Sequence, residues 1–211
     1  NNTYILNATV GRPSEGNVYT IKVADTENDG IKEIIVPDAG NSNVYIFEWN
    51  GNSYELKINF AVADNPVALD AFDIDRDGTT EIITGDSTAN GRFFVHGFNG
   101  FNYVEEFRSP SLSSTINGFV HGDLDDDGIE EIVIGASDRF FVYSYAAASY
   151  VQEFRSNVIG ATIAATDIAD WDKDGNLELA IGMSSPGRVE VYQFNESNNY
   201  TREFFADASS D

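Results

Sequence analysis

The stretch from Asp123 to Gly135, DLDDDGIEEIVIG, places six acidic side chains in nine positions and then turns apolar. Three similar stretches occur, at residues 25–36 (DTENDGIKEIIV), 73–85 (DIDRDGTTEIITG) and 170–182 (DWDKDGNLELAIG). All four share the pattern D-x-[DE]-x-D-G-x-x-E, and their glycines are spaced by 48, 50 and 47 residues. A fixed period of this length predicts a repeat protein in which each repeat is one supersecondary unit.

Short apolar runs around each acidic stretch define the rest of the repeat. An apolar segment precedes the stretch, and a run such as EIVI follows it. Two further aromatic or β-branched runs, such as RFFVYSY and YVQEFRS, complete the unit. Turn residues separate these runs and include Asn50-Gly51 and Asn99-Gly100, a strong hairpin signal. Each repeat is therefore predicted to form four short antiparallel strands.

Four-stranded units at this period indicate an all-β fold, a β-propeller in which each unit is one blade. The alternative is a β-sandwich with accidental similarity between its strands, and four in-register copies argue against it. We expect a single domain over residues 1–211, with blades at about residues 17–60, 65–109, 115–156 and 161–206.

Residues 3–9 (TYILNAT) resemble one more outer strand, so the inventory is four blades plus one surplus N-terminal outer strand. Three explanations are open. The chain is part of a longer array of blades, it closes four blades and leaves one strand over, or it lends the strand to a neighbouring molecule's sheet edge. The chain begins at Asn1 without an initiator methionine, which we interpret as a processed or excised chain.

The 211-residue chain is strongly acidic, with a formal net charge of -23, yet 42% of its residues are apolar. It can therefore bury a core and is not a disordered acidic tail. The charge argues against nucleic acid and anionic membranes as partners, and no apolar run approaches the ~20 residues that span a bilayer. Cysteine is absent, which excludes disulfides and thiolate chemistry. Weak support for a secreted protein comes from the sequons at Asn1, Asn7, Asn195 and Asn199.

The acidic stretches have the residue order of a calcium loop. Carboxylates at positions 1, 3 and 5 face one centre, glycine at position 6 allows a sharp turn, the position-7 carbonyl faces the same centre, and an acidic residue closes the shell. Here the closing Glu stands at position 9 and strands flank the loop, so an EF-hand is excluded. The predicted ligands are Asp25, Glu27, Asp29, Ile31 and Glu33; Asp73, Asp75, Asp77, Thr79 and Glu81; Asp123, Asp125, Asp127, Ile129 and Glu131; and Asp170, Asp172, Asp174, Asn176 and Glu178.

Hard, anionic oxygen ligands favour Ca²⁺ over Mg²⁺, which retains several waters, and over Zn²⁺, which prefers Cys and His. We expect about four ions, one per blade, with the first loop weakest because Glu27 stands where the other loops have Asp. Without cations the four clusters repel and destabilise the blades, so the metal is expected to act as the staple that replaces disulfides.

These motifs resemble a known family. The D-x-D-x-D-G-x-x-E pattern, followed by an apolar run and Ile134-Gly135-Ala136-Ser137, is similar to the FG-GAP/VCBS repeats of integrin α-subunit-like propellers. The resemblance covers roughly residues 19–205, although the FG and GAP parts are degraded. It implies structural Ca²⁺, a ring that commonly has seven blades, and a role in extracellular adhesion or carbohydrate binding. Four blades depart from that pattern.

We expect a non-enzyme, because no nucleophile–base spacing or phosphate loop is present and His96 and His121 are better explained as packed or surface residues. The leading hypothesis is an extracellular module that recognises a protein or glycan. Loops on the face opposite the metal loops vary between repeats, which suits recognition. Arg92, Arg139 and Arg188 recur near that face, where a packing role is favoured. The alternatives are a self-associating surface-layer or filament subunit and the propeller of a polysaccharide-active enzyme.

Overall fold

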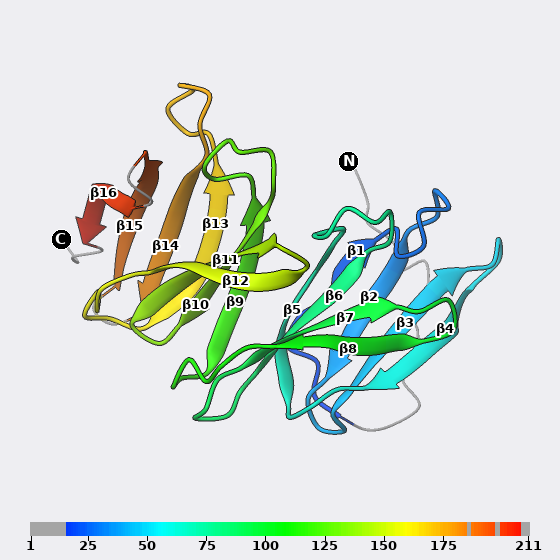
Figure 1. Ribbon diagram of the computed structural model, residues 1–211. Coiled ribbons are helices and arrows are strands. Elements are labelled where there is room, and N and C mark those ends of the chain that lie inside the picture. Colours follow the sequence, from blue (N-terminus) through cyan, green and yellow to red (C-terminus); the bar gives the residue numbers. More distant parts are fainter. Residues whose placement is uncertain (1–15, 185–186, 197–198, 208–211) are drawn as a thin grey trace, which may run out of the picture.

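The computed structural model describes residues 16–184, 187–196 and 199–207, and these form four sheets of four antiparallel strands (Figure 1). Each sheet is one sequence repeat, with its strands in chain order. Blade one holds β1 (Lys22–Ala24), β2 (Glu33–Asp38), β3 (Asn43–Trp49) and β4 (Tyr54–Ala61). Blade two holds β5 (Pro66–Phe72), β6 (Glu81–Asp86), β7 (Phe93–Phe98) and β8 (Tyr103–Arg108). Blade three holds β9 (Ile116–Gly122), β10 (Glu131–Ala136), β11 (Arg139–Ala146) and β12 (Ser149–Arg155). Blade four holds β13 (Ile163–Ala169), β14 (Glu178–Ser184), β15 (Gly187–Asn195) and β16 (Asn199–Asp207).

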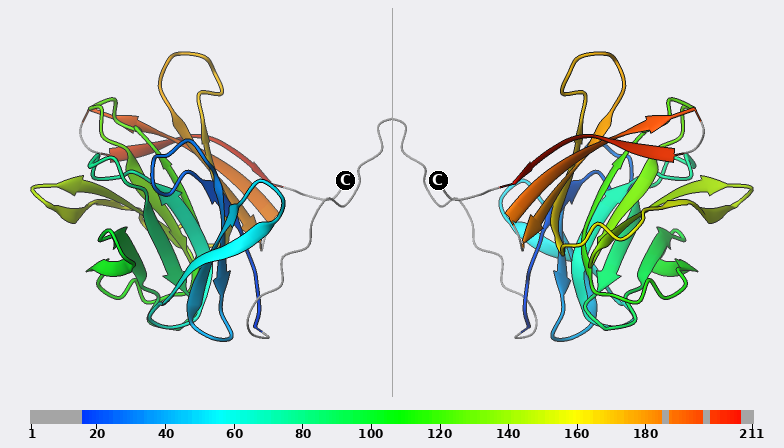
Figure 2. Two further views of the ribbon diagram at one scale, coloured as in Figure 1. Left: turned by 90° about the vertical axis from the view of Figure 1, so that its right-hand side faces the viewer. Right: turned by 90° about the vertical axis from the view of Figure 1, so that its left-hand side faces the viewer.

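The first strands of the blades, β1, β5, β9 and β13, are the inner strands, and each contacts the next in this order. The sheets fan outward from them, so that β4, β8, β12 and β16 are the outer edges. The four acidic loops connect the first and second strands and emerge at the upper side of the molecule in Figure 1. The loop after β13 also projects beyond the strands in both side views (Figure 2).

Apolar side chains fill the spaces between neighbouring blades. The fully buried Phe93 lies between blades two and three, and Phe140 lies between blades three and four. Glycines follow the apolar runs because these blades approach closely. A Cβ at Gly85 would lie 2.6 Å from Ile116, and a Cβ at Gly135 would lie 2.8 Å from Ile163. The packing between blades thus explains both the aromatic runs and the glycines after them.

A buried carboxylate joins three inner strands at the centre. Asp70 on β5 is fully buried and lies 2.8 Å from the Lys22 ammonium of β1 and 2.9 Å from His121 Nδ1 of β9. The His121 ring also stacks on Phe72, with centroids 3.9 Å apart. Burial opposes the charge on Asp70, but its hydrogen bonds and charge pairing with His121 and Lys22 outweigh burial and lower its pKa. The centre of the fan is therefore held by ionic contacts between blades.

The described blades form an open fan. Within these residues, no contact comparable to those between consecutive inner strands joins β13 back to β1. The end blades correspondingly expose large apolar side chains, among them Tyr19, Ile21 and Val23 at one end and Phe204 and Phe205 at the other. The predicted surplus strand at residues 3–9 lies outside the described residues. No helix in the described part is long and apolar enough to cross a membrane.

Candidate metal centres

The four acidic loops share one backbone arrangement, built by their own carboxylates. In loop four the amide of Gly175 donates to Asp170 Oδ2 at 3.2 Å, and the amide of Asn176 donates to Asp174 Oδ1 at 2.8 Å. The equivalent pairs are Gly30–Asp25 and Ile31–Asp29, Gly78–Asp73 and Thr79–Asp77, and Gly128–Asp123 and Ile129–Asp127. The residue two before each glycine also has positive φ, at Asn28, Arg76, Asp126 and Lys173. Two left-handed residues per loop turn the chain sharply enough to gather its acidic side chains.

The closing Glu also holds the loop backbone, a role that the prediction of a metal ligand does not include. One oxygen of Glu178 accepts the backbone amide of Trp171 at 2.9 Å, which ties the base of the loop to β14. The same bond joins Glu33 to Thr26, Glu81 to Ile74 and Glu131 to Leu124. All four Glu side chains are buried. Burial, reinforced by neighbouring acids, raises the pKa of both Glu81 and Glu131 to about 8. Burial disfavours the ionised form of these carboxylates, and a nearby positive charge would stabilise it.

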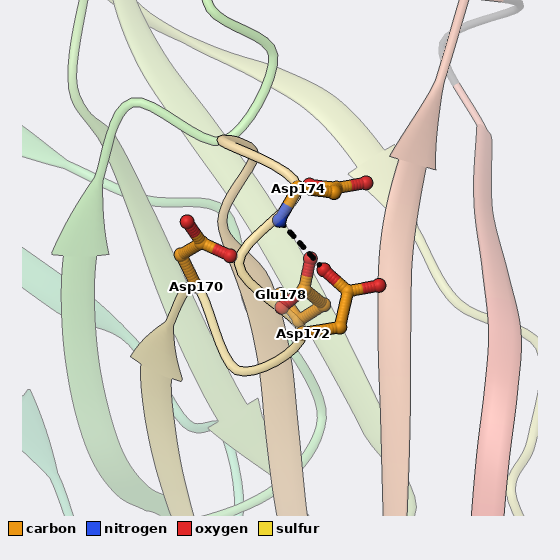
Figure 3. A group of neighbouring side chains, drawn as sticks. All are labelled: Asp170, Asp172, Asp174 and Glu178. Atoms are coloured by element: carbon orange, nitrogen blue, oxygen red, sulfur yellow. Dashed lines mark hydrogen bonds between the residues drawn. The ribbon is translucent and has the colours of Figure 1, made fainter.

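Carboxylates converge in loops two, three and four. In each group below, one ligand atom from every residue lies within 4.8 Å of the others, and Figure 3 shows the largest group. The groups are Asp73, Asp75 and Glu81; Asp123, Asp125 and Asp127; and Asp170, Asp172, Asp174 and Glu178. Asp77 and Glu131 belong to the same loops but lie outside these groups. The position-7 residues Ile31, Thr79, Ile129 and Asn176 donate their amides within the loops, and ligation by their carbonyls stays a prediction.

One carboxylate oxygen in each of these three loops has no partner in the protein. Oδ1 of Asp73, of Asp123 and of Asp170 is buried and accepts no hydrogen bond. An unsatisfied buried carboxylate oxygen is costly, and a bound cation removes that cost. The donor set is entirely oxygen, as a hard divalent cation requires. Loops two to four therefore fit Ca²⁺.

The carboxylates of loop one have different partners from those of the other loops. Both oxygens of Asp25 are used within the loop, because Asp29 donates its amide to Oδ1 at 3.0 Å and Gly30 donates to Oδ2 at 2.8 Å. In loops two to four, the position-5 amide instead donates to the position-3 Asp. Glu27 at position 3 turns to the Lys57 ammonium, 3.0 Å away. The described residues of loop one therefore form no carboxylate group like those of the other loops.

Lys57 and Glu48 are site residues that lie outside the acidic motif. The Lys57 ammonium lies 3.3 Å from Glu48 and 3.7 Å from the buried Glu33, in addition to its contact with Glu27. Burial opposes its charge, but the three glutamates outweigh burial and raise the pKa of Lys57. Lys57 lies on β4, outside the loop motif. Aligning the outer-strand runs YELKINF and YVEEFRS places it opposite a Glu, and that comparison was the available signal.

The other candidate residues have packing roles. His96 is buried, with Nδ1 3.2 Å from the carbonyl of Ile82, and burial lowers its pKa. Each recurring arginine donates to a backbone carbonyl that follows an outer strand, in its own blade for Arg92 and Arg139 and in blade three for Arg188. Arg92 contacts Ser109, Arg139 contacts Ser156 and Arg188 contacts Ile159, at 2.7, 2.8 and 2.6 Å. The favoured packing interpretation of the arginines accounts for these contacts.

A cleft of about 640 Å³ opens at the strand ends opposite the metal loops. Blades one, two and three line it, mainly with neutral polar side chains and Tyr19, which is 66% exposed. Its polar lining includes Asn17, Asn65, Ser87, Thr115 and Asn117. The cleft lies among the variable loops predicted to form the recognition face.

Comparisons with solved structures place this fold among β-propellers. The chain is similar to BBS1N in its complex with ARL6DN, with a TM-score of 0.63 and 11% identity over 92% of this chain and 58% of that one. It is also similar to Sqt1 of Saccharomyces cerevisiae, with a TM-score of 0.65 and 12% identity over 91% of this chain and 48% of that one. The chain thus spans about half the length of these two structures.

The particular repeat is identified by its sequence. Residues 25–84 match the model of the FG-GAP-like repeat, which confirms the resemblance found from the acidic motifs. The match covers loop one, strands β2 to β5, loop two and the start of β6. A comparison with curated proteins found no match. The chain therefore has a β-propeller fold, and the part of it at residues 25–84 matches an FG-GAP-like repeat.

Proposed function

We propose that the chain is a non-catalytic, calcium-stabilised propeller module. The observation that carries this proposal is that Asp73, Asp123 and Asp170, one member of each carboxylate group, have a buried Oδ1 without a hydrogen-bond partner. A cation at each centre neutralises charges that otherwise repel and joins the first and second strands of its blade. Extracellular calcium is abundant enough to fill sites of moderate affinity, which supports an extracellular or cell-surface location.

Calcium binding is tested by isothermal titration calorimetry on chelator-stripped protein, with Mg²⁺ as the competing ion. We expect Ca²⁺ to bind and to raise the melting temperature, and Mg²⁺ to do so less. The D170N variant retains an acceptor for Gly175 but removes the anionic ligand, so it should lose one equivalent of Ca²⁺. If stripped wild-type protein binds no Ca²⁺ and chelation leaves its melting temperature unchanged, the proposal fails.

We further propose that the cleft opposite the metal loops recognises a protein or glycan ligand. Its amide and hydroxyl groups suit neutral hydroxyl-rich ligands, and exposed Tyr19 offers an aromatic face for stacking. The acidic loops lie at the other strand ends, so they do not repel a ligand in the cleft. Support for a non-catalytic role comes from the two histidines, because His96 is buried against the Ile82 carbonyl and His121 joins Asp70 and stacks on Phe72.

Binding is tested with the calcium-loaded chain on an array of glycans and extracellular matrix proteins. The Y19A and N65A variants should lose binding to any ligand found. F101A is the matched control, because Phe101 is 91% exposed on the β7–β8 turn, at the metal-loop end. Equal binding by Y19A, N65A and wild-type protein would exclude the cleft.

Self-association is a second candidate, favoured by the apolar side chains exposed at the two end blades. If two copies join end to end, Phe204 and Phe205 of one meet Tyr19, Ile21 and Val23 of the other. Sedimentation velocity should then show a concentration-dependent dimer that F204S weakens. A monomer at all concentrations would exclude this candidate and leave the calcium proposal intact.

A further inference from the structure

A β-bulge recurs at the same place in the outer strand of every blade. In blade two, Val95 pairs with Phe107 and His96 with Glu105, so Glu106 is left over between the two pairs. The same shift leaves Lys57, Glu153 and Glu203 unpaired in the other blades. A bulge re-aims the side chain of the extra residue, and such features recur next to functional sites. The strand register therefore establishes that these four residues are equivalent.

In blades two, three and four the bulge residue is a Glu that faces the acidic loop of its own blade. Glu203 lines a cavity of about 280 Å³ together with Asp172 and Glu178. Glu106 lies over Gly97 of the neighbouring strand, and Glu153 accepts a hydrogen bond from Ser144 at 2.6 Å. The strand register gives both residues the position of Lys57, whose side chain reaches Glu27 of its own loop. Each of these blades thus adds a fifth carboxylate to the four of its loop.

In blade one the bulge residue has the opposite charge. The Lys57 side chain is 19% exposed and ends among Glu27, Glu33 and Glu48, at 3.0, 3.7 and 3.3 Å. Among the described residues, no lysine or arginine forms an ion pair with a ligand of loops two to four. The position-1 Asp differs accordingly, because Oδ1 of Asp25 is hydrogen-bonded whereas its counterparts are not.

We infer that the bulge residue of the outer strand determines whether a blade takes up calcium, so that the Lys57 ammonium replaces the ion in blade one and the chain binds three ions instead of four. A covalently attached ammonium supplies the positive charge that loop one requires, and it repels a divalent cation at the same place. The glutamates of the other blades instead add negative charge, which attracts a cation. This inference rests on the proposed calcium binding and specifies its number and its determinant.

The first test needs no variant. Native mass spectrometry and calorimetry on stripped wild-type protein should both give three Ca²⁺ per chain. Four ions would overturn the inference while leaving the proposed function standing. No binding at all would overturn the proposed function itself, so the two failures are distinguishable.

The second test exchanges the bulge residues. K57E gives blade one the residue that the other blades have, and it should raise the count from three to four. E203K places an ammonium beside loop four and should lower the count to two. K32E is the matched control, because Lys32 is exposed in the same loop and the substitution changes the net charge equally; it should leave the count at three.

Circular dichroism in excess chelator and in calcium checks the folding of each variant. A folded K57E that stays at three ions, or a folded E203K that keeps three, would overturn the role of the bulge residue. If K57E does not fold, the calcium counts of E203K and of the wild-type protein test the inference, because blade four retains its own strand pairing in E203K.

Discussion

Loops one and four have the same backbone turn, but their acidic side chains have different partners. In both, glycine at position 6 has positive φ, its amide donates to the position-1 Asp, and the buried closing Glu holds the position-2 amide. Loop four leaves Asp170 Oδ1 buried without a partner and gathers Asp172, Asp174 and Glu178 around it. Loop one directs Glu27 and Glu33 to Lys57. The acidic motif therefore specifies a turn, and side chains on neighbouring strands decide whether a lysine of the chain meets its carboxylates.

Calcium removal should give the largest difference between loop one and loops two to four. A ligand at 100 times its dissociation constant stabilises the folded state by about 2.7 kcal/mol per site. Chelation should therefore lower the melting temperature and increase amide exchange in loops two to four, while loop one retains its protection. Hydrogen exchange with mass spectrometry measures both. An equal loss of protection in all four loops would contradict the distinction.

The inner-strand contacts provide a metal-independent comparison. D70N removes the charge that faces Lys22 and His121, and we expect a loss of about 1–3 kcal/mol in the free energy of unfolding. Because the partners of Asp70 are Lys22 and His121 and none of the predicted metal ligands, the loss should be equal with calcium and with chelator. Urea denaturation in both conditions measures it. A loss confined to calcium-loaded protein would show that the centre and the loops are coupled.

The same carboxylate predicts a pH dependence. The pKa of Asp70 is lower in the folded protein than its ordinary value, so its stabilising contribution is present above the ordinary value. The contribution is lost as pH falls through the folded pKa. In chelator, the stability difference between wild-type protein and D70N should therefore shrink as pH decreases below about 4. A constant difference down to pH 2 would contradict this assignment.

Substitution of the loop glycines should show that the backbone is shared. Gly30 and Gly175 have φ of +87° and +100°, and a Cβ at either position meets nothing within 4 Å. G30A and G175A should each cost about 1–2 kcal/mol in chelator, since only the conformational strain of a left-handed alanine remains. Thermal denaturation measures the pair. A much larger cost in one loop would show that the two backbones are not equivalent.

The smallest effect is expected at the partly exposed edge of loop one. E48Q removes one of the three partners of Lys57, and both side chains reach solvent. Solvent screening limits such a pair to less than about 1 kcal/mol, and added salt should reduce the effect further. The calcium count should not change. A gain of one ion in E48Q would contradict the view that Lys57 neutralises loop one mainly through Glu27 and Glu33.

The sequence by itself determined the repeat, the four-stranded blades and the position of each acidic loop. These follow from local patterns, because turn residues and alternating apolar runs are short-range signals. It also identified the glycines at which the loops turn and the arginines that pack against the ends of the outer strands. Four calcium sites, the first of them the weakest, were predicted from the same motif, since the motif contains only the loop.

Only the tertiary structure decided that Lys57 neutralises loop one and how the blades are joined. Lys57 follows loop one by more than twenty residues, and antiparallel pairing with a bulge brings its ammonium to Glu27 and Glu33. Asp70 likewise meets Lys22 and His121 only because three inner strands come together. Electrostatic interactions depend on distance in space, which separation along the chain does not reveal. A local motif can therefore determine the shape of a loop, while the strands around it determine which charged groups the loop contacts.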